Sequence, residues 1–275
     1  MDASGTAWVT GASRGIGRAS ALELARRGFH VVASMRNPDD GRSLVREATA
    51  LGLRVELSRL DVDSPGDFEA PRGLRVLVNN AGVDPGNDAV EFTPQETWRA
   101  AFSTNLFGAV EVTRRALPAL RASGGGVVCN VTTASLLVPM PFFSVYRASK
   151  AALSAFGESL RSECAPHGIR VVEVLPGAIE TEMLAASAIR PAAAAHAPYR
   201  AQAELVERQR AGAAGPGTPV AQAARAIADA ILDDSTPLRV ACDPMGEALL
   251  ARWRSLSDEE GMAPLVAAFD PRSRS

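Results

Sequence analysis

The sequence of 275 residues predicts an α/β protein in which helices cover both faces of a parallel β-sheet. Short runs rich in β-branched residues alternate with longer helical patterns, as repeated strand–helix–strand units require. Runs such as VLV and VVEVL are almost continuously apolar, which is typical of strands buried on both faces. The sequence has no internal repeat and no stretch with the composition of an interdomain linker, so we expect one domain.

Seven strands are expected, at residues 7–10, 31–34, 55–60, 76–79, 127–131, 171–175 and 239–241. Helical patterns lie between them, at residues 16–27, 41–51, 94–122, 146–167 and 220–232. The segment between residues 61 and 79 carries two prolines and little periodicity, so any helix there is short or absent. Residues 183–219 are rich in alanine and are expected to form a substrate lid or insertion. Residues 244–275 are expected to form a C-terminal extension that contains a helix.

The composition argues against several functional classes. The net charge of −2 at pH 7 gives no reason to expect nucleic acid or an anionic membrane as a partner. The three cysteines, Cys129, Cys164 and Cys242, are widely spaced, so neither a disulfide framework nor a metal site is indicated. The chain begins MDASGTAWVTGAS, without the basic and apolar regions of a signal peptide, and no apolar run reaches membrane-spanning length. We therefore expect a cytoplasmic protein.

The sequence VTGASRGIGRA follows the first expected strand and opens the first helix. Its glycines, Gly11, Gly15 and Gly17, let the chain turn tightly and let a pyrophosphate approach the N–H groups at the helix N-terminus. An acidic residue after the second strand would bind the ribose 2′-hydroxyl of NAD, but Arg36 follows that strand and Arg14 lies in the glycine loop. Two guanidinium groups favour a 2′-phosphate, so we expect NADP rather than NAD.

Tyr146 and Lys150 are four residues apart and would lie on one face of a helix. Lys150 is the only lysine of the chain, and Tyr146 is one of its two tyrosines. A phenol has a pKa near 10, too high for efficient proton transfer at neutral pH, and a nearby ammonium is expected to lower that pKa. The pair is therefore a candidate proton-transfer site.

Four motifs occur in the order TGASRGIG, NNAG at residues 79–82, Tyr146-x-x-x-Lys150, and PG at residues 176–177. With them the chain closely resembles the short-chain dehydrogenase/reductase family over residues 6–183 and the last strand. It is similar to the branch that contains 17β-hydroxysteroid dehydrogenases and retinol-type reductases. The resemblance implies a single doubly wound Rossmann-type domain with a seven-stranded parallel sheet. It also implies a homodimer or homotetramer assembled through the helices at residues 94–122 and 146–167.

The resemblance assigns roles to individual residues. Asp61 and Val62 would meet the adenine, and Asn80 the inner ribose region. Ile179 and Thr181 would meet the nicotinamide carboxamide, and Asn105 would hold a water molecule that connects to the lysine. The expected cofactor-binding residues are Gly11, Ser13, Arg14, Gly15, Ile16, Gly17, Arg36, Asp61, Val62, Asn79, Asn80, Ala81, Gly82, Tyr146, Lys150, Pro176, Gly177, Ile179 and Thr181.

Hydride transfer from a nicotinamide to a carbonyl carbon leaves negative charge on the oxygen, and Tyr146 would donate a proton to it. The family usually places a serine thirteen residues before the tyrosine to stabilise this charge, and Thr133 occupies that position here. Threonine keeps the hydroxyl donor, although its methyl group narrows the pocket and restricts the rotamer. Ser135, eleven residues before Tyr146, is the alternative donor.

The apolar run LLVPMPFF lies between the threonine and the tyrosine. In this family such a loop flanks the substrate, and the alanine-rich segment would close over it. No Arg or Lys occurs in this loop to pair with a substrate carboxylate, which favours a hydrophobic ketone or alcohol. The expected substrate-binding residues are Leu137, Met140, Phe142, Met183, Leu184 and Tyr199.

The leading expectation is an NADP-dependent carbonyl reductase or alcohol dehydrogenase. A second enzymatic alternative is reduction of a C=N or C=C bond, for which a serine is less essential. A third alternative is an NADP-binding regulator without turnover. The intact pair of Tyr146 and Lys150 argues against the regulator.

Overall fold

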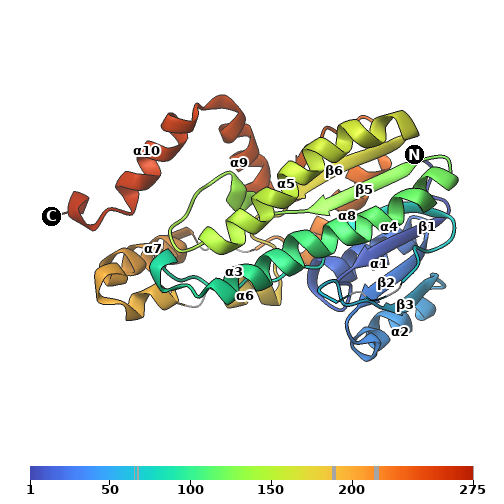
Figure 1. Cartoon of the computed structure of the whole chain (residues 1–275), viewed down its shortest axis with the longest axis horizontal. Helices are drawn as coiled ribbons and strands as arrows, with labels where there is room; N and C mark the ends of the chain where they lie inside the picture. The colour runs from blue at the N-terminus through green and yellow to red at the C-terminus, as the bar shows by residue number, and fades with distance from the viewer. Residues whose placement is uncertain (65, 67, 188–189, 214–216, 275) are drawn as a thin grey trace.

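Seven parallel strands form one sheet at the centre of the computed structural model, which describes all residues except 65, 67, 188–189, 214–216 and 275 (Figure 1). Their order is β3-β2-β1-β4-β5-β6-β7. The seven expected strands are confirmed, with ends that differ from the prediction by at most two residues. The order reverses between β1 and β4, which is where open α/β sheets bind ligands at the carboxyl ends of their strands. The strands are β1 (Thr6–Thr10), β2 (His30–Met35), β3 (Val55–Arg59), β4 (Leu74–Asn79), β5 (Gly126–Val131), β6 (Ile169–Leu175) and β7 (Arg239–Ala241).

Helices cover both faces of this sheet. Helices α1, α2 and α8 pack on one face, and α4 and α5 pack on the other (Figure 1). Consecutive strand residues such as Leu77 and Val78 point to opposite faces and are both fully buried, which explains the continuous apolar runs. The α-helices are α1 (Gly15–Arg26), α2 (Arg42–Ala50), α3 (Gln95–Phe102), α4 (Ala109–Ala122), α5 (Ser144–Cys164), α6 (Glu182–Ser187), α7 (Arg200–Ala213), α8 (Val220–Leu232), α9 (Pro244–Ser255) and α10 (Asp258–Ala268).

The helical pattern at residues 94–122 is not one regular helix. A π-helical turn, Ser103–Gly108, separates α3 from α4. At its end the chain passes so close to Val62 that a Cβ on Gly108 would lie 2.7 Å from the Val62 Cβ. A π-helical turn widens the helix by one residue per turn, and such turns are frequent at functional sites. Here the turn carries Asn105, which is fully buried.

The alanine-rich segment and the C-terminal extension fold together at one end of the molecule (Figure 1). Side chains of Gln202 and Gln209, on α7, donate to the carbonyl oxygens of Phe269 and Ala268, each at 3.2 Å. We call the apolar cluster beneath them the lid core. It consists of Ala89, Phe142, Ala193, Ala194, Ala203, Val206 and Phe269, with Met140, Tyr199 and Leu265 packed against it.

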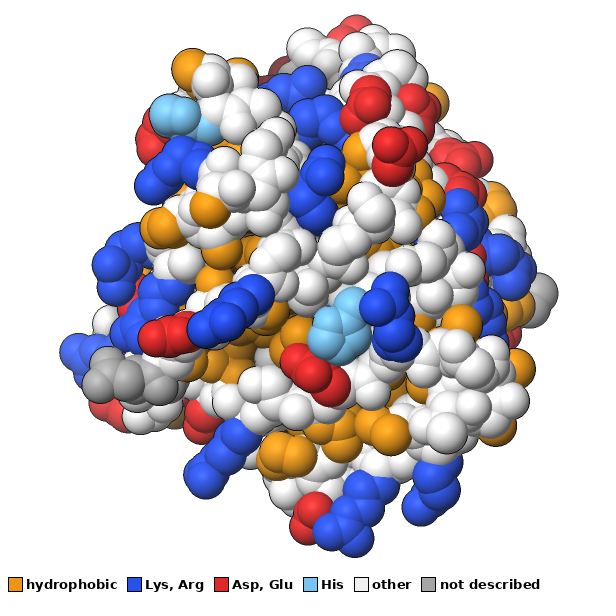
Figure 2. All heavy atoms as spheres, turned by 90° about the vertical axis from the view of Figure 1, so that its right-hand side faces the viewer, with side chains coloured by type: hydrophobic (Ala, Val, Ile, Leu, Met, Phe, Trp, Pro, Cys, Tyr) orange, Lys and Arg blue, Asp and Glu red, His pale blue; other side chains and the backbone are white. Residues whose placement is uncertain are grey.

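The opposite end of the molecule carries charges of both signs. In Figure 2, arginine and acidic side chains are both spread over this face, with small apolar areas between them. Among the described residues, no three His, Cys, Asp or Glu side chains are grouped as a metal ion would require. No helix within the described part of the chain has both the length and the apolar character needed to cross a bilayer.

Candidate active site

The glycine loop between β1 and α1 forms a cradle into which side chains do not fit. Gly11 and Gly15 have φ angles of 64° and 53°, which residues with a Cβ rarely adopt. A Cβ on Gly17 would overlap Asn80 Nδ2 and the carbonyl oxygen of Gly11. Asn80 Nδ2 donates to the carbonyl oxygens of Thr10 at 2.9 Å and Gly11 at 3.1 Å, so this side chain braces the loop. The open backbone at the start of α1 fits a pyrophosphate group.

The NNAG motif fixes the carboxyl end of β4. Asn79 is 3% exposed, and its Nδ2 donates to Thr113 Oγ1 on α4 at 2.8 Å and to Asn130 Oδ1 on β5 at 2.9 Å. This side chain therefore joins β4, α4 and β5. The N–H of Ala81 donates to Thr10 Oγ1 at 3.1 Å, which holds the motif against the end of β1.

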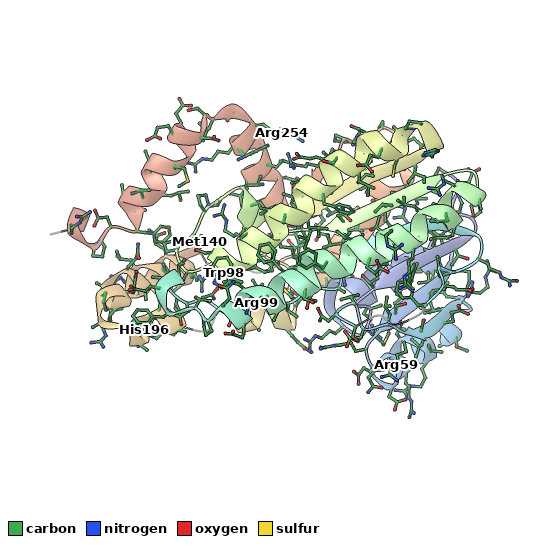
Figure 3. All side chains as sticks on the ribbon, viewed as in Figure 1. Arg59, Trp98, Arg99, Met140, His196 and Arg254 are labelled. Atoms are coloured by element: carbon green, nitrogen blue, oxygen red, sulfur yellow. The ribbon has the colours of Figure 1, made fainter. Side chains whose placement is uncertain are left out.

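Three arginines lie on the side where the sequence predicts the 2′-phosphate. Arg14 is exposed and pairs with Glu182 on α6 at 2.8 Å, which links the glycine loop to the lid. Arg36 is exposed directly after β2. Arg59, which the sequence analysis missed, is exposed at the end of β3 and is paired in register with Met35 (Figure 3). Only the register between β2 and β3 indicates that Arg59 lies near the end of β2, and this register is known only from the folded sheet.

The remaining predicted residues on this side are half-buried. Ser13 lies in the glycine loop, and Ile16 packs against the core beneath α1. Asp61 Oδ1 accepts a hydrogen bond from the N–H of Asp63 at 3.2 Å, which turns the chain after β3. Val62 packs against the π-helical turn. These residues lie near the carboxyl ends of β1 and β3.

The PG motif after β6 is anchored by a carboxylate that the sequence analysis did not identify. The N–H of Gly177 donates to Asp243 Oδ2 at 2.6 Å, and Asp243 also caps α9 and is 2% exposed. In the sequence, the pair Asp243-Pro244, which is typical of a helix start, could have pointed to this capping carboxylate. Pro176 and Ile179 are buried, so Ile179 has only its backbone to offer a cofactor. Thr181 Oγ1 accepts the N–H of Leu184 at 3.2 Å at the start of α6.

Tyr146 and Lys150 lie one turn apart on α5. Lys150 is 4% exposed, and its Nζ donates to the carbonyl oxygen of Val131 at 2.8 Å. A Cβ on Gly82 would lie 3.2 Å from this nitrogen, so the lysine reaches the NNAG loop. Burial lowers the pKa of Lys150 to about 8, because the ammonium loses hydration.

The pKa of Tyr146 moves in the direction opposite to our expectation. Burial and the negative charge of Asp84 raise it to about 12, against a smaller lowering effect of a hydrogen bond with Thr133. The prediction that Lys150 lowers this pKa is wrong for this structure, because loss of hydration around the phenol is the dominant effect. The phenol is therefore held as a proton donor.

Thr133 is the hydroxyl next to the phenol. Its side chain is 8% exposed and is hydrogen-bonded to Tyr146. Thr133 Oγ1 also donates to Ser135 Oγ at 3.1 Å and accepts the Ser135 N–H at 3.2 Å. The two candidate donors therefore form one chain of hydroxyls, in which Thr133 stands between Ser135 and the phenol.

Asn105 fixes the loop that follows the NNAG motif. Its Oδ1 accepts the N–H of Val83 at 2.8 Å, and its Nδ2 donates to the Val83 carbonyl oxygen at 3.0 Å and to Ser149 Oγ at 2.9 Å. All these partners are protein groups around the catalytic face of α5. The side chain thus connects the π-helical turn to both the loop and α5.

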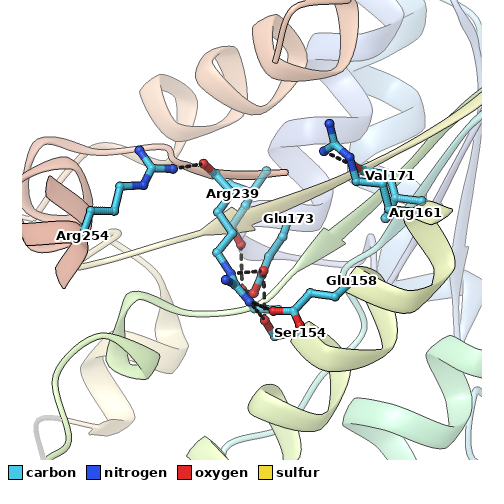
Figure 4. Close-up of polar contacts among 9 residues, drawn as sticks. Ser154, Glu158, Arg161, Val171, Glu173, Arg239 and Arg254 are labelled. Carbon is cyan, nitrogen blue, oxygen red and sulfur yellow. Dashed lines mark hydrogen bonds and ion pairs between the residues drawn. The ribbon is translucent and has the colours of Figure 1, made fainter. Parts of the chain in front are cut away.

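A buried ionic network lies behind the hydroxyl donor (Figure 4). Glu173 on β6 is 1% exposed, and its Oε1 accepts from Thr132 Oγ1 at 2.9 Å. Its Oε2 accepts from Ser154 Oγ at 3.0 Å and from Arg239 Nε at 2.8 Å. The Arg239 guanidinium lies 5.6 Å from the ring centroid of Trp253 on α9. The network joins the end of β5 to α5, β7 and the C-terminal extension.

Three of the six predicted substrate residues meet in the lid core. Phe142 is 7% exposed, has a φ of 70°, and lies edge-on to the Tyr199 ring at 6.0 Å. Met140 packs against the same cluster, and His196 stacks on Phe92 with ring centroids 3.7 Å apart (Figure 3). A positive φ is strained for phenylalanine, and such strain clusters at ligand clamps and switch regions.

The other three predicted substrate residues lie elsewhere. Leu137 lines a separate cavity of about 510 Å³ between α3, α5 and α9, together with Trp98 and Trp253. Met183 is 41% exposed on α6, and Leu184 follows it in the same helix. The structure therefore places Leu137 in this cavity and not in the lid core.

A basic residue from elsewhere in the chain lies beside the loop LLVPMPFF, which the sequence analysis did not expect. Arg210 on α7 places its guanidinium 4.6 Å from the ring centroid of Phe143, three residues before Tyr146. Arg210 belongs to the lid and is remote in sequence from the loop on which the expectation was based, so the sequence alone did not place it there.

A family model described as short chain dehydrogenase matches residues 5–191. The chain is 37% identical over 188 residues to YusZ, an uncharacterised oxidoreductase of Bacillus subtilis, covering 65% of this chain and 66% of that protein. It is 34% identical over 187 residues to estradiol 17-beta-dehydrogenase 2 of Rattus norvegicus, covering 64% of this chain and 48% of that protein. The match thus spans just under two thirds of one relative and about half of the other.

Solved structures match nearly the whole chain. A short chain dehydrogenase of Burkholderia cenocepacia in complex with NADP has a TM-score of 0.74 and 26% identity, covering 97% of this chain and 99% of that one. A short-chain dehydrogenase of Streptomyces avermitilis has a TM-score of 0.72 and 32% identity, covering 92% of both chains. The structural likeness therefore extends beyond the residues that the family model matches.

Proposed function

The chain belongs to the short-chain dehydrogenase family, and on this premise we propose that it is an NADP(H)-dependent oxidoreductase that interconverts a hydrophobic ketone and its secondary alcohol. The observation that carries the proposal is the grouping of three side chains: Tyr146 and the buried Lys150 lie one helical turn apart on α5, and Thr133 is close enough to the phenol to lower its pKa. The three groups supply the proton donor, its neighbouring hydroxyl and a cation at the carboxyl edge of the sheet.

In the proposed reaction each side chain has a separate task. The nicotinamide, when bound, supplies the hydride to the carbonyl carbon. Tyr146 donates its phenolic proton to the carbonyl oxygen, and its raised pKa keeps that proton available at neutral pH. Thr133 donates a hydrogen bond to the same oxygen as negative charge develops there. Lys150 would hold the ribose hydroxyls of the bound cofactor, which it reaches from α5 beside the NNAG loop.

The cofactor is proposed to be NADP(H). The cradle of Gly11 and Gly17 fits the pyrophosphate, and Arg14, Arg36 and Arg59 offer guanidinium groups to a 2′-phosphate. Arg36→Ala should raise the KM for NADPH about tenfold or more while changing the KM for NADH much less. Equal effects on the two cofactors would contradict the assignment.

The direct test is NADPH oxidation with a panel of hydrophobic ketones, imines and enones. Tyr146→Phe should lower kcat by about 10²- to 10⁴-fold while leaving NADPH binding in place. Tyr199→Phe is the comparison, because it removes only the hydroxyl of the other tyrosine and keeps the ring that packs on the lid core; it should lower kcat much less than Tyr146→Phe does. Turnover confined to imines or enones would favour the C=N or C=C alternative. NADPH binding without turnover of any member would favour a regulator.

We also propose assembly into a homodimer or homotetramer through α4 and α5. The support is an exposed face of small side chains on α5, including Ala151 and Ala155, with Phe107 63% exposed beside the start of α4. Light scattering on the purified protein gives the mass directly, and a monomer at micromolar concentration would contradict this.

A further inference from the structure

The short turn after β5 is bound to Thr133, the proposed hydroxyl donor. It is a single 3₁₀ turn, Ala134–Leu136, and such short turns hold few hydrogen bonds of their own. Thr133 caps it, since its Oγ1 accepts the N–H of Ser135 at 3.2 Å and its carbonyl oxygen accepts the N–H of Leu136 at 3.2 Å. A shift of this turn therefore moves the hydroxyl as well.

Arg147 binds the other end of the same turn. Its Nε donates to the carbonyl oxygen of Ser135 at 2.7 Å, and its Nη2 donates to that of Leu136 at 3.3 Å. The last carbonyl groups of a helical turn have no partner within it, and an arginine side chain can satisfy them. The planar guanidinium fixes the two carbonyl groups in direction as well as in distance. The turn is thus held by Thr133 at its start and by Arg147 at its end.

Arg147 directly follows Tyr146 in the first turn of α5. Its N–H donates to the carbonyl oxygen of Phe143 at 2.9 Å, so its backbone is part of the helix. Consecutive helix residues point in directions about 100° apart, so Arg147 reaches the turn without occupying the face on which Tyr146 and Lys150 lie. The turn that Thr133 caps is therefore fastened to the same helical turn that carries the phenol.

We propose that Arg147 is a positioning residue, which holds the hydroxyl of Thr133 beside the phenol of Tyr146. It acts through the turn that it binds and has no contact with the reacting atoms. The inference rests on the proposed oxidoreductase function and adds the residue that sets the geometry of its hydroxyl donor. Both groups must meet one carbonyl oxygen, and a displacement of about 1 Å is enough to lower turnover by about 100-fold.

A role in folding alone would have a different signature. An arginine that only stabilises the fold lowers activity by the same factor whether or not the Thr133 hydroxyl is present. A positioning residue loses its effect once the group that it positions has been removed. The dependence of the Arg147 effect on Thr133 therefore separates the two roles.

The test is a double-mutant cycle of Arg147→Met and Thr133→Val. The measured quantity is kcat with NADPH and a ketone that the unmodified enzyme reduces, taken from single turnovers where the steady state is too slow. Arg147→Met alone should lower kcat by about 10- to 100-fold and change the KM for NADPH by less than about twofold. In the Thr133→Val background the same change should lower kcat by less than about twofold.

A second measurement uses the cavity of about 510 Å³ that Arg147 and Leu136 help to line. Arg147→Ala leaves space there for a small planar cation. Guanidinium chloride at a concentration that does not denature the protein should restore kcat severalfold, and sodium chloride at the same concentration should not. Rescue by guanidinium of the same size in the Thr133→Val background would contradict the inference.

Arg161→Met is the matched control. Arg161 is an exposed arginine nearer the other end of α5, and its Nη1 donates to the carbonyl oxygen of Val171 at 3.3 Å (Figure 4). The variant removes the same kind of hydrogen bond from the same helix and should keep kcat. Arg147→Lys keeps the cycle decisive if Arg147→Met fails to fold, because an ammonium retains the charge but lacks the planar fork. Its smaller loss of kcat should also vanish in the Thr133→Val background.

Each outcome bears on a separate statement. An unchanged kcat in Arg147→Met overturns this inference and leaves the proposed function standing. A loss of kcat that is equally large in the Thr133→Val background, or in Arg161→Met, overturns it as well. Absence of NADPH-dependent turnover by the unmodified protein with every ketone contradicts the proposed function itself, and the inference falls with it.

Discussion

The charge on Glu173 is expected to contribute strongly to stability, and Glu173→Gln tests this with almost no change of shape. The carboxylate is 1% exposed and accepts hydrogen bonds from Thr132, Ser154 and Arg239. The glutamine amide keeps one acceptor oxygen, but its NH₂ group cannot accept a hydrogen bond from the neighbouring donors. The side chain of Arg239, 23% exposed, loses its buried counter-charge.

The magnitude follows from burial. Removing one partner of a buried ion pair costs about 3–5 kcal/mol in the free energy of unfolding. Arg239 retains Glu158 and partial contact with water, so we expect the lower end, about 3 kcal/mol. Glu158 pairs with the same arginine but is 48% exposed, so Glu158→Gln should cost less than about 1 kcal/mol. Each variant therefore removes one carboxylate charge that pairs with Arg239, one exposed and one buried.

Equilibrium unfolding in urea, which leaves ion pairs unscreened, measures both free energies. The reasoning is refuted if Glu173→Gln lies within about 1 kcal/mol of the unmodified protein, or if Glu158→Gln costs as much. In the first case the buried network would contribute no more to the free energy of unfolding than an exposed ion pair does.

Three further outcomes are expected. Burial raises the pKa of Tyr146 to about 12, and a hydrogen bond to Glu91 raises the pKa of Tyr199, so the midpoint of the tyrosinate absorbance should lie above about pH 10, the ordinary value for tyrosine. A step near pH 8 that disappears in Tyr146→Phe would contradict this. Phe269→Ala, in the lid core, should cost about 3 kcal/mol of local stability and speed hydrogen exchange in α7, whereas Phe107→Ala, 63% exposed, should not. Gly17→Ala should abolish NADPH binding measured by fluorescence titration, and binding at unchanged affinity would refute the described cradle.

The sheet and the placement of Tyr146 and Lys150 on one helix could be predicted from sequence because their signals are local. Buried parallel strands must be apolar on both faces, and the glycine loop and the Tyr146–Lys150 spacing occupy single short segments. The π-helical turn could not be predicted, since STNLFG continues an ordinary helical pattern. What widens the helix is the close approach of Val62 to Gly108, a contact between distant segments.

The substrate side was predicted less well for the same reason. Met140 and Phe142 lie near Tyr199, as predicted, but nothing in the loop indicated that Leu137 lines a separate cavity. Arg210 was missed because it comes from the alanine-rich segment, which has little periodicity. The direction of the Tyr146 pKa was wrong because burial of the phenol is a property of the folded chain, not of the four-residue spacing.

The hydrogen bonds from α7 to the carbonyl oxygens of Ala268 and Phe269 can form only late in synthesis of the chain. The glycine loop, Lys150 and six of the seven strands belong to the first 175 residues. Phe269 of the lid core is synthesised long after them. During translation the first six strands and the glycine loop can therefore form before the lid core is complete. A chain stopped shortly before Phe269 would keep these strands and the glycine loop but would lack this part of the lid core.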